Sequence, residues 1–241
     1  MKGYFRKLIY FSSVDGPGNR TIIFLQGCNF DCKYCHNPET INIIEGNNIP
    51  KNVELLDHIE LVDMSLKHKD FINGITISGG ECTYQFEFLV DLCKEYKKRD
   101  INVFIDTNGY FTEEQYNILS KYVDKFMFDL KAFNNKEHKL LTGKENLLCI
   151  NNIKKALKDD KVFEIRTVIV PSLLNNFRNV YFTSELIYKF STNKNIRYKL
   201  IKYRANGVRK RFRNFNTPSD DYMMELKRVS INNGVINTII V

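Results

Sequence analysis

Three cysteines, Cys28, Cys32 and Cys35, fall within eight residues of one another. They follow an apolar run of strand length at residues 21–26, so we expect them on a loop at the end of a strand. The C-x3-C-x2-C spacing lets a short loop bring three thiolates together around one metal ion or cluster. Thiolates bind zinc and iron–sulfur clusters. His36 is the nearby candidate for a fourth zinc ligand, but its position beside Cys35 makes convergence on one ion awkward. Three ligands suit a cluster with one open iron; coincidental buried thiols and a zinc knuckle are the alternatives.

The composition is that of a globular protein with a sizeable core. The chain has 241 residues, of which 43% are hydrophobic, and 36 Lys+Arg against 28 Asp+Glu give a charge of +8. These values exclude disorder, collagen and a coiled coil. No run approaches the roughly 20 apolar residues needed to cross a bilayer, and residues 1–10 do not read as a signal peptide. The lack of such a run also disfavours a membrane as partner. The other cysteines, Cys82, Cys93 and Cys149, are dispersed, which indicates free thiols in a reducing cytoplasm.

The elements that must position these residues alternate between strand and helix. Helical spacing appears at residues 55–66 and 85–96. Strict alternation implies parallel pairing, because a parallel neighbour is reached through a crossover that is usually a helix. The class is therefore α/β, as an incomplete barrel or an open doubly wound sheet, and in both the chemistry sits at the carboxyl ends of the strands. Six strands are predicted at residues 21–26, 75–78, 102–106, 125–130, 163–170 and 197–203, with a short closing strand at 237–241.

Helix-end signals add detail to this pattern. Thr112 with Gln115 three residues later predicts a capping box, and Gly143 predicts a helix stop. Thr217 and Pro218 are expected to be the N-cap and first residue of the last helix. We find no repeat, linker or composition break, so the expectation is a single domain over residues 1–241.

The motifs, read together, resemble one known family. C-x3-C-x-aromatic-C, with Tyr34 as the aromatic, is similar to the motif of the radical S-adenosylmethionine (SAM) superfamily. Four further segments extend the resemblance to glycyl-radical-enzyme activases of the pyruvate formate-lyase-activating type: Val-Asp-Gly-Pro-Gly at 14–18, Ser-Gly-Gly-Glu at 78–81, Asp-Thr-Asn-Gly at 106–109 and Asp-Leu-Lys at 129–131. The resemblance runs in order from about residue 10 to residue 170. It implies an incomplete (β/α)6 TIM-like barrel with parallel strands, forming a single radical SAM domain.

The resemblance also implies the cofactors. Cys28, Cys32 and Cys35 would hold a [4Fe–4S] cluster whose open iron is chelated by SAM. An electron from the reduced cluster would cleave the sulfonium to methionine and a 5′-deoxyadenosyl radical, which abstracts hydrogen from a backbone glycine of a glycyl radical enzyme. The protein would orient the sulfonium and keep the radical from water.

Further positions would contact SAM by the same resemblance. Gly79, Gly80 and Glu81 would meet the methionine amine, the alternative being a plain strand-to-helix turn. Tyr34 and His36 would lie beside the adenine, although a lone His is as readily structural.

Asp106, Asp129 and Leu130 fall in segments that the family uses near the ribose and for a monovalent cation, and Lys131 would face the SAM carboxylate. An ordinary ion pair between Asp129 and Lys131 is the alternative.

The match departs from the family after the sixth strand. By the resemblance, pyruvate formate-lyase activases have Pro-Tyr-His at this point, and their His reaches the SAM carboxylate. This chain has Lys202-Tyr203-Arg204 instead, so we expect Arg204 to replace the His as the partner of that carboxylate. The basic run from Arg204 to Arg213 would contact either the partner enzyme or an acidic electron donor such as a flavodoxin or ferredoxin. The alternative is a solvated loop that binds neither. Nucleic acid is disfavoured as a partner. Two other functions stay open: a radical SAM enzyme acting on a small molecule, and a non-catalytic iron–sulfur or zinc redox protein.

Overall fold

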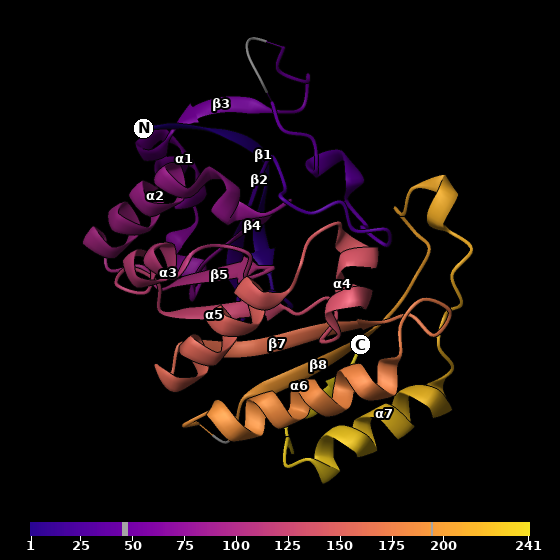
Figure 1. The fold of residues 1–241 in the computed structure, drawn as a ribbon. Helices are drawn as coiled ribbons and strands as arrows, with labels where there is room; N and C mark the ends of the chain where they lie inside the picture. Colours follow the sequence, from indigo (N-terminus) through magenta and orange to yellow (C-terminus); the bar gives the residue numbers. More distant parts are fainter. Residues whose placement is uncertain (45–47, 194) are drawn as a thin grey trace. The chain divides into compact units, whose positions relative to one another are not determined.

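The computed structural model describes residues 1–44, 48–193 and 195–241 (Figure 1). Strands and helices alternate through most of the described chain. The strands are β1 (Lys2–Ser12), β2 (Arg20–Leu25), β3 (Glu54–Asp57), β4 (Gly74–Gly79), β5 (Val103–Thr107), β6 (Lys125–Asp129), β7 (Val162–Ile169), β8 (Arg197–Lys202) and β9 (Thr238–Ile240). The helices are α1 (His58–Ser65), α2 (Phe86–Lys98), α3 (Glu113–Leu119), α4 (Asn135–Thr142), α5 (Leu147–Lys158), α6 (Asn176–Phe190) and α7 (Asp220–Asn232), with short 3-10 turns η1 (Pro38–Thr40), η2 (Lys69–Phe71), η3 (Cys82–Gln85) and η4 (Lys210–Phe212).

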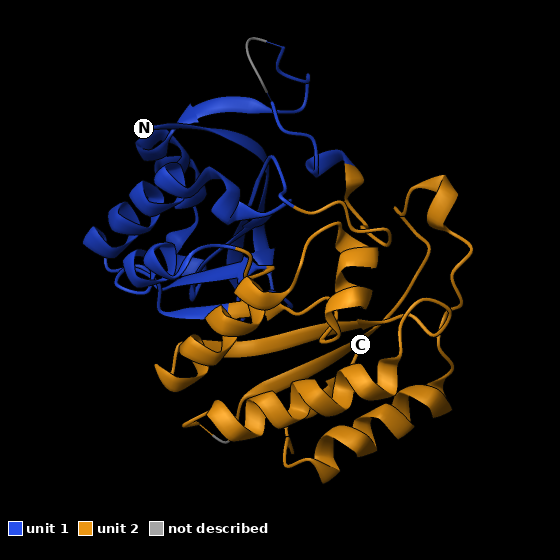
Figure 2. Ribbon diagram, viewed as in Figure 1, with its two compact units in different colours: residues 1–29, 39–107, 111–126 blue, residues 30–38, 108–110, 127–241 orange. Residues whose placement is uncertain are grey.

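The chain separates into two compact units that interleave along the sequence (Figure 2). Unit 1 contains residues 1–29, 39–107 and 111–126, and unit 2 contains Phe30–Pro38, Asn108–Tyr110 and Met127–Val241. Strand β6 begins in the first unit and ends in the second. The expectation of one domain over residues 1–241 stays a prediction.

The strand order is β3-β1-β2-β4-β5-β6-β7-β8-β9, with different strands at its two ends. In unit 1, β2 pairs with β4 and β4 with β5 in parallel; in unit 2, β7 pairs with β8 and β8 with β9 in parallel. All seven strands expected from the apolar runs are present, and the α/β class with an unclosed, largely parallel sheet is confirmed.

Two strands were not predicted. β1 pairs antiparallel with both β2 and β3, so the sheet is mixed at this edge. Charged Lys2, Arg6 and Lys7 interrupt the apolar pattern of β1 because this strand is only partly buried. β3 takes residues 54–57, where helical spacing was expected, and Asp57 then caps α1 through its side chain.

The other helix ends test three more predictions. Thr112 and Gln115 form the expected capping box on α3, and Gly143 ends α4 in the left-handed conformation at φ 83°. The prediction for the last helix was wrong. Ser219, not Thr217, is the N-cap of α7 because its side chain accepts from the backbone N–H of Tyr222 at 3.2 Å.

Apolar helix faces complete the core of each unit. In unit 1, α1 and α2 lie side by side, and α2 buries Leu89 and Leu92. In unit 2, α6 and α7 lie side by side (Figure 1). Within the described residues, no helix has both the length and the apolar character needed to span a membrane.

Candidate functional site

Cys28 lies in unit 1, three residues after the end of β2. The backbone N–H of Gly27 donates to the carbonyl of Thr40 at 2.9 Å, and the N–H of Cys28 donates to Ile41 at 3.1 Å. The carbonyl of Gly27 accepts from the N–H of Glu81 at 2.9 Å. Cys28 is therefore held through main-chain bonds on both sides of the strand end, and its thiol is partly exposed and free of any disulfide.

Gly79 and Gly80 are required here for backbone packing. Gly79 has φ +147°, and a Cβ on it would collide with the backbone of Leu25. A Cβ on Gly80 would lie 2.5 Å from the carbonyl oxygens of both Gly27 and Thr40. Since real Cβ atoms do not approach backbone so closely, this turn admits no side chain. In unit 1, the backbone of Gly80 therefore packs closely against the chain beside Cys28. The predicted contact of this turn with the SAM amine stays a prediction.

Glu81 is a buried carboxylate, 2% exposed, at the start of η3. Its Oε1 accepts from the N–H of Thr83 at 3.1 Å, the hydroxyl of Thr83 at 2.6 Å and the hydroxyl of Thr107 at 2.7 Å. Hydrogen bonds from these donors stabilise a carboxylate at this position. Glu81 thus anchors the turn, and its predicted role toward the methionine amine stays a prediction.

Asp106 lies near the end of β5, as the sequence predicted. Its Oδ2 accepts from the hydroxyl of Ser78 on β4 at 3.1 Å. Ser78 belongs to the Ser-Gly-Gly-Glu segment but was not singled out as a site residue. The pair places two oxygen-bearing side chains at neighbouring strand ends of unit 1.

Cys32 and Cys35 lie in unit 2, on the segment Phe30–Pro38, here called the cysteine loop. The loop is fixed to the end of α4, because the N–H groups of Asp31 and Lys33 donate to Thr142 and Leu141, both at 3.0 Å. Within it, the N–H of Cys35 donates to the carbonyl of Cys32 at 3.1 Å. Burial raises the pKa of the Cys32 thiol to about 12, despite the opposing charge of Lys131. A bound metal would reverse this by displacing the proton.

Tyr34 is the aromatic residue of the cysteine motif, and it is 4% exposed. It packs in a cluster with Ala132, Leu141, Tyr203 and Val208, among others. Its hydroxyl has no hydrogen-bond partner among the described residues. A buried hydroxyl without a partner is costly, so this atom is suited to a polar group of a ligand.

Asp129 and Lys131 flank Leu130 at the end of β6. The ammonium of Lys131 lies 2.9 Å from Oδ2 of Asp129 and 6.0 Å from the ring centre of Tyr34, so the ion pair considered from sequence is present. Burial alone would raise the pKa of Asp129, but the charges of Lys131, Arg166 and Lys199 outweigh it and hold that pKa below its usual value. Burial acts against the charge of Lys131, yet Asp129 raises the pKa of Lys131 well above its usual value. Leu130 is buried and contributes backbone, its N–H donating to Arg166 at 3.0 Å.

A cluster of charges on β7 and β8 was missed by sequence reasoning. Glu164 is fully buried, and its carboxylate binds Arg166 at 2.5 Å, Lys199 at 2.9 Å and also Arg197. The register pairs Glu164 with Arg197 and Arg166 with Lys199, which places all four on one face. The alternation of charge inside otherwise apolar strands was the available signal. Three cations therefore surround the one buried carboxylate of Glu164.

His36 and Arg204 meet in unit 2, but not as the sequence predicted. Nε2 of His36 lies 2.9 Å from the carbonyl oxygen of Arg204, and since a carbonyl only accepts, Nε2 carries the proton. Arg204 is exposed. The His36 ring therefore connects two segments, while the predicted contacts of His36 with adenine and of Arg204 with the SAM carboxylate stay predictions.

The donor set fits an iron–sulfur cluster. Cys28, Cys32 and Cys35 form no disulfide, and thiolates are the ligands that such clusters take. Among residues 1–44, 48–193 and 195–241, no group of three His, Cys, Asp or Glu side chains is arranged to hold a metal ion. The convergence of the three thiols, and a cation near Asp106 and Asp129, therefore stay predictions.

Comparison with known proteins agrees with the donor set. The profile of the radical SAM superfamily matches residues 22–175. A pyruvate formate-lyase-activating enzyme of Clostridium pasteurianum is 36% identical, covering 82% of this chain and 80% of that protein. One from Staphylococcus epidermidis is 30% identical over 98% of both chains. The crystal structure of QueE from Escherichia coli superposes with a TM-score of 0.63 at 14% identity, over 100% of this chain and 94% of that one, which shows the shared fold.

Proposed function

The chain belongs to the radical SAM superfamily and, within it, to the family of pyruvate formate-lyase-activating enzymes, and from this premise we propose that it abstracts hydrogen from a backbone glycine of a glycyl radical enzyme. The observation that carries the proposal is identity of 30–36% to such activases over most of the chain, with three cysteines outside any disulfide in the matched region. The reaction balances when SAM, one electron from a reductant and the glycine of the partner enzyme are converted to methionine, 5′-deoxyadenosine and a glycyl radical.

Cys28, Cys32 and Cys35 would hold the [4Fe–4S] cluster. When bound there, the cluster supplies the electron that cleaves the sulfonium of SAM. The protein's part is to fix the thiols. Main-chain bonds hold the chain at Cys28, and bonds to the end of α4 hold the loop that carries Cys32 and Cys35.

The charges of unit 2 suit the carboxylate of SAM. Lys131 stays protonated because Asp129 compensates for its burial, so it is available as a cationic partner. Arg204 is exposed and would supply a second one. The unpartnered hydroxyl of Tyr34 would take a polar group of the nucleoside.

Glu81 and the backbone of Gly79 and Gly80 would face the amine. The donors on Oε1 fix the position of the Glu81 side chain, and a carboxylate suits an ammonium partner. Asp106, Asp129 and the backbone of Leu130 would lie toward the ribose and a monovalent cation.

A cytoplasmic flavodoxin or ferredoxin would deliver the electron. Such donors are acidic, and the charge of +8 together with the run from Arg204 to Arg213 favours their approach. Cysteines that form no disulfide fit a reducing compartment.

The proposal is tested by anaerobic reconstitution with iron and sulfide, followed by mixing with SAM, a reductant and pyruvate formate-lyase. We expect an electron paramagnetic resonance (EPR) doublet of a glycyl radical, formed only when all components are present. SAM cleavage driven by a small molecule without the partner enzyme would support the small-molecule reaction instead. A cluster without any SAM cleavage would overturn the enzymatic proposal.

A further inference from the structure

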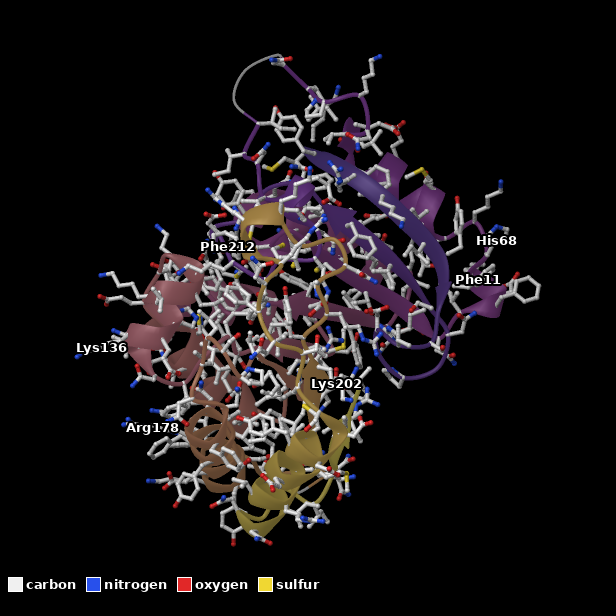
Figure 3. The ribbon with its side chains drawn as sticks, turned by 90° about the vertical axis from the view of Figure 1, so that its right-hand side faces the viewer. Phe11, His68, Lys136, Arg178, Lys202 and Phe212 are labelled. Atoms are coloured by element: carbon white, nitrogen blue, oxygen red, sulfur yellow. The ribbon has the colours of Figure 1, made fainter. Side chains whose placement is uncertain are left out.

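Two segments of unit 2 that are far apart in sequence are joined at several points. One is the cysteine loop; the other is residues 203–213, here called the strap, which follows β8 and contains η4. Figure 3 labels Phe212 in the strap and Lys202 at the end of β8, just before it. The His36 ring donates to the carbonyl of Arg204 at 2.9 Å. Gly207, at φ +78°, approaches the carbonyl of His36 so closely that a Cβ there would collide with it.

The strap is itself well anchored. The hydroxyl of Tyr203 donates to the carbonyl of Phe212 at 3.1 Å, and Nε of Arg213 donates to the carbonyl of Val208 at 2.6 Å. Tyr203 and Val208 are fully buried, in the cluster that also contains Tyr34. The strap therefore presents its remaining side chains from a fixed backbone.

Arg209 makes the most specific of the contacts between the two segments. Its Nη1 binds the carboxylate of Asp31, and its Nη2 donates to the backbone carbonyls of Asp31 at 3.3 Å and Cys32 at 2.9 Å. The Cys32 carbonyl also accepts from the N–H of Cys35. One planar guanidinium thus fixes the peptide that carries Cys32, which the single ammonium of a lysine cannot do.

We propose that Arg209 is a positioning residue for the cluster site, and that its ion pair with Asp31 tunes the reduction potential of the cluster. The inference rests on the proposed function, because it assumes that Cys32 is a cluster ligand. Groups that orient metal ligands without touching the metal commonly alter affinity by about 10–100-fold. Net charge around an iron–sulfur cluster is one determinant of its potential.

The direction of each shift in reduction potential follows from the negative charge of the added electron. Reduction adds a negative charge, so a nearby cation favours it and a nearby anion opposes it. Loss of the Arg209 charge leaves Asp31 uncompensated and lowers the potential. Loss of the Asp31 charge leaves Arg209 uncompensated and raises it. Both changes break the same ion pair, so a merely structural role would not produce opposite shifts.

The test uses reconstituted full-length protein carrying Arg209→Met, Asp31→Asn or Arg209→Lys, with Lys210→Met as a control on an exposed neighbouring cation. EPR-monitored redox titration gives the midpoint potential, and iron release to a chelator gives the lifetime of the cluster. We expect Arg209→Met to lower the potential, Asp31→Asn to raise it and Lys210→Met to leave it unchanged. Arg209→Lys keeps the charge but loses the planar fork, so its potential should stay and its cluster should be lost about tenfold faster than in the wild type.

Shifts of the same sign in Arg209→Met and Asp31→Asn, or no shift in either, would overturn the inference and leave the proposed function intact. If Arg209→Met does not fold, the rise in Asp31→Asn and the faster iron loss in Arg209→Lys still decide it. Wild-type protein that takes up no cluster would overturn the proposed function and this inference together.

Discussion

In unit 1 the site residues are anchored by backbone contacts and neutral donors, whereas in unit 2 they are anchored by charges. Gly80 packs against two carbonyl groups, and Glu81 is held by hydroxyl and amide donors. In unit 2, Asp129 pairs with Lys131, and Glu164 binds three cations. Neutral bonds depend little on pH and salt, whereas ion pairs depend on both. The comparison therefore predicts different responses to mutation and pH in the two units.

The largest effect is expected at the cysteines, which occur in both units. Cys28→Ala in unit 1 and Cys32→Ala or Cys35→Ala in unit 2 should each abolish the cluster, because each removes one of three ligands. Cys82→Ala, in unit 1, should retain it. Iron and sulfide content after reconstitution is the measurement. Equal loss in all four variants would contradict the ligand assignment.

The second largest effect is a difference in stability loss between Glu164, which is held by charged groups, and Glu81, which is held by neutral donors. Glu164→Gln leaves buried cations uncompensated and should destabilise the protein by about 3–5 kcal/mol. Glu81→Gln keeps an accepting oxygen and should cost about 1–2 kcal/mol. Urea unfolding of the apo proteins measures both. Equal losses would break the distinction between the two units.

A third prediction concerns the backbone packing in unit 1. Gly80→Ala should destabilise by about 1–3 kcal/mol, since the new Cβ meets two carbonyl oxygens that cannot yield. Gly143→Ala is the control, because no atom lies within 4 Å of its added Cβ and only the positive φ costs, by about 1–2 kcal/mol. Only Gly80→Ala should also reduce iron uptake, because its Cβ pushes on the chain beside Cys28. Unchanged uptake in Gly80→Ala would contradict the packing role.

The smallest effect is a pH dependence assigned to unit 2. The lowered pKa of Asp129 contributes stability that is present above its unfolded value of about 3.9 and is lost as pH falls through the lower folded value. The raised pKa of Lys131 contributes stability below about 10.4 that is lost as pH rises through the higher folded value. Asp129→Asn should remove the acid-side contribution in urea titrations across pH. The same acid-side slope in that variant would contradict the assignment.

Sequence reasoning recovered the elements whose signals are local. The apolar runs gave all seven expected strands, and the Thr112–Gln115 box and Gly143 stop were correct because caps depend on a few neighbouring residues. β1 was missed because its partial burial leaves charges within an apolar pattern. The N-cap of α7 was misplaced because Thr217, Pro218 and Ser219 offer competing start signals.

For the candidate site, too, sequence reasoning found the features with local signals and missed those without them. Candidate residues came from motifs, but their partners depend on contacts across long sequence separations. Nothing near Asp31 indicates that Arg209 binds it, and the alternating charges of β7 and β8 do not by themselves show which cations meet Glu164. Such pairings arise from strand register and from the path of the strap, which short-range patterns do not encode.

Hydrogen abstraction from the partner's glycine is tested most directly by following the abstracted hydrogen atom. Pyruvate formate-lyase prepared with glycine deuterated at the α-carbon is incubated anaerobically with this protein, SAM and a reductant, and the 5′-deoxyadenosine is examined by mass spectrometry. We expect the product to gain one deuterium as the glycyl radical appears. 5′-Deoxyadenosine without deuterium, formed while the partner enzyme stays radical-free, would contradict it.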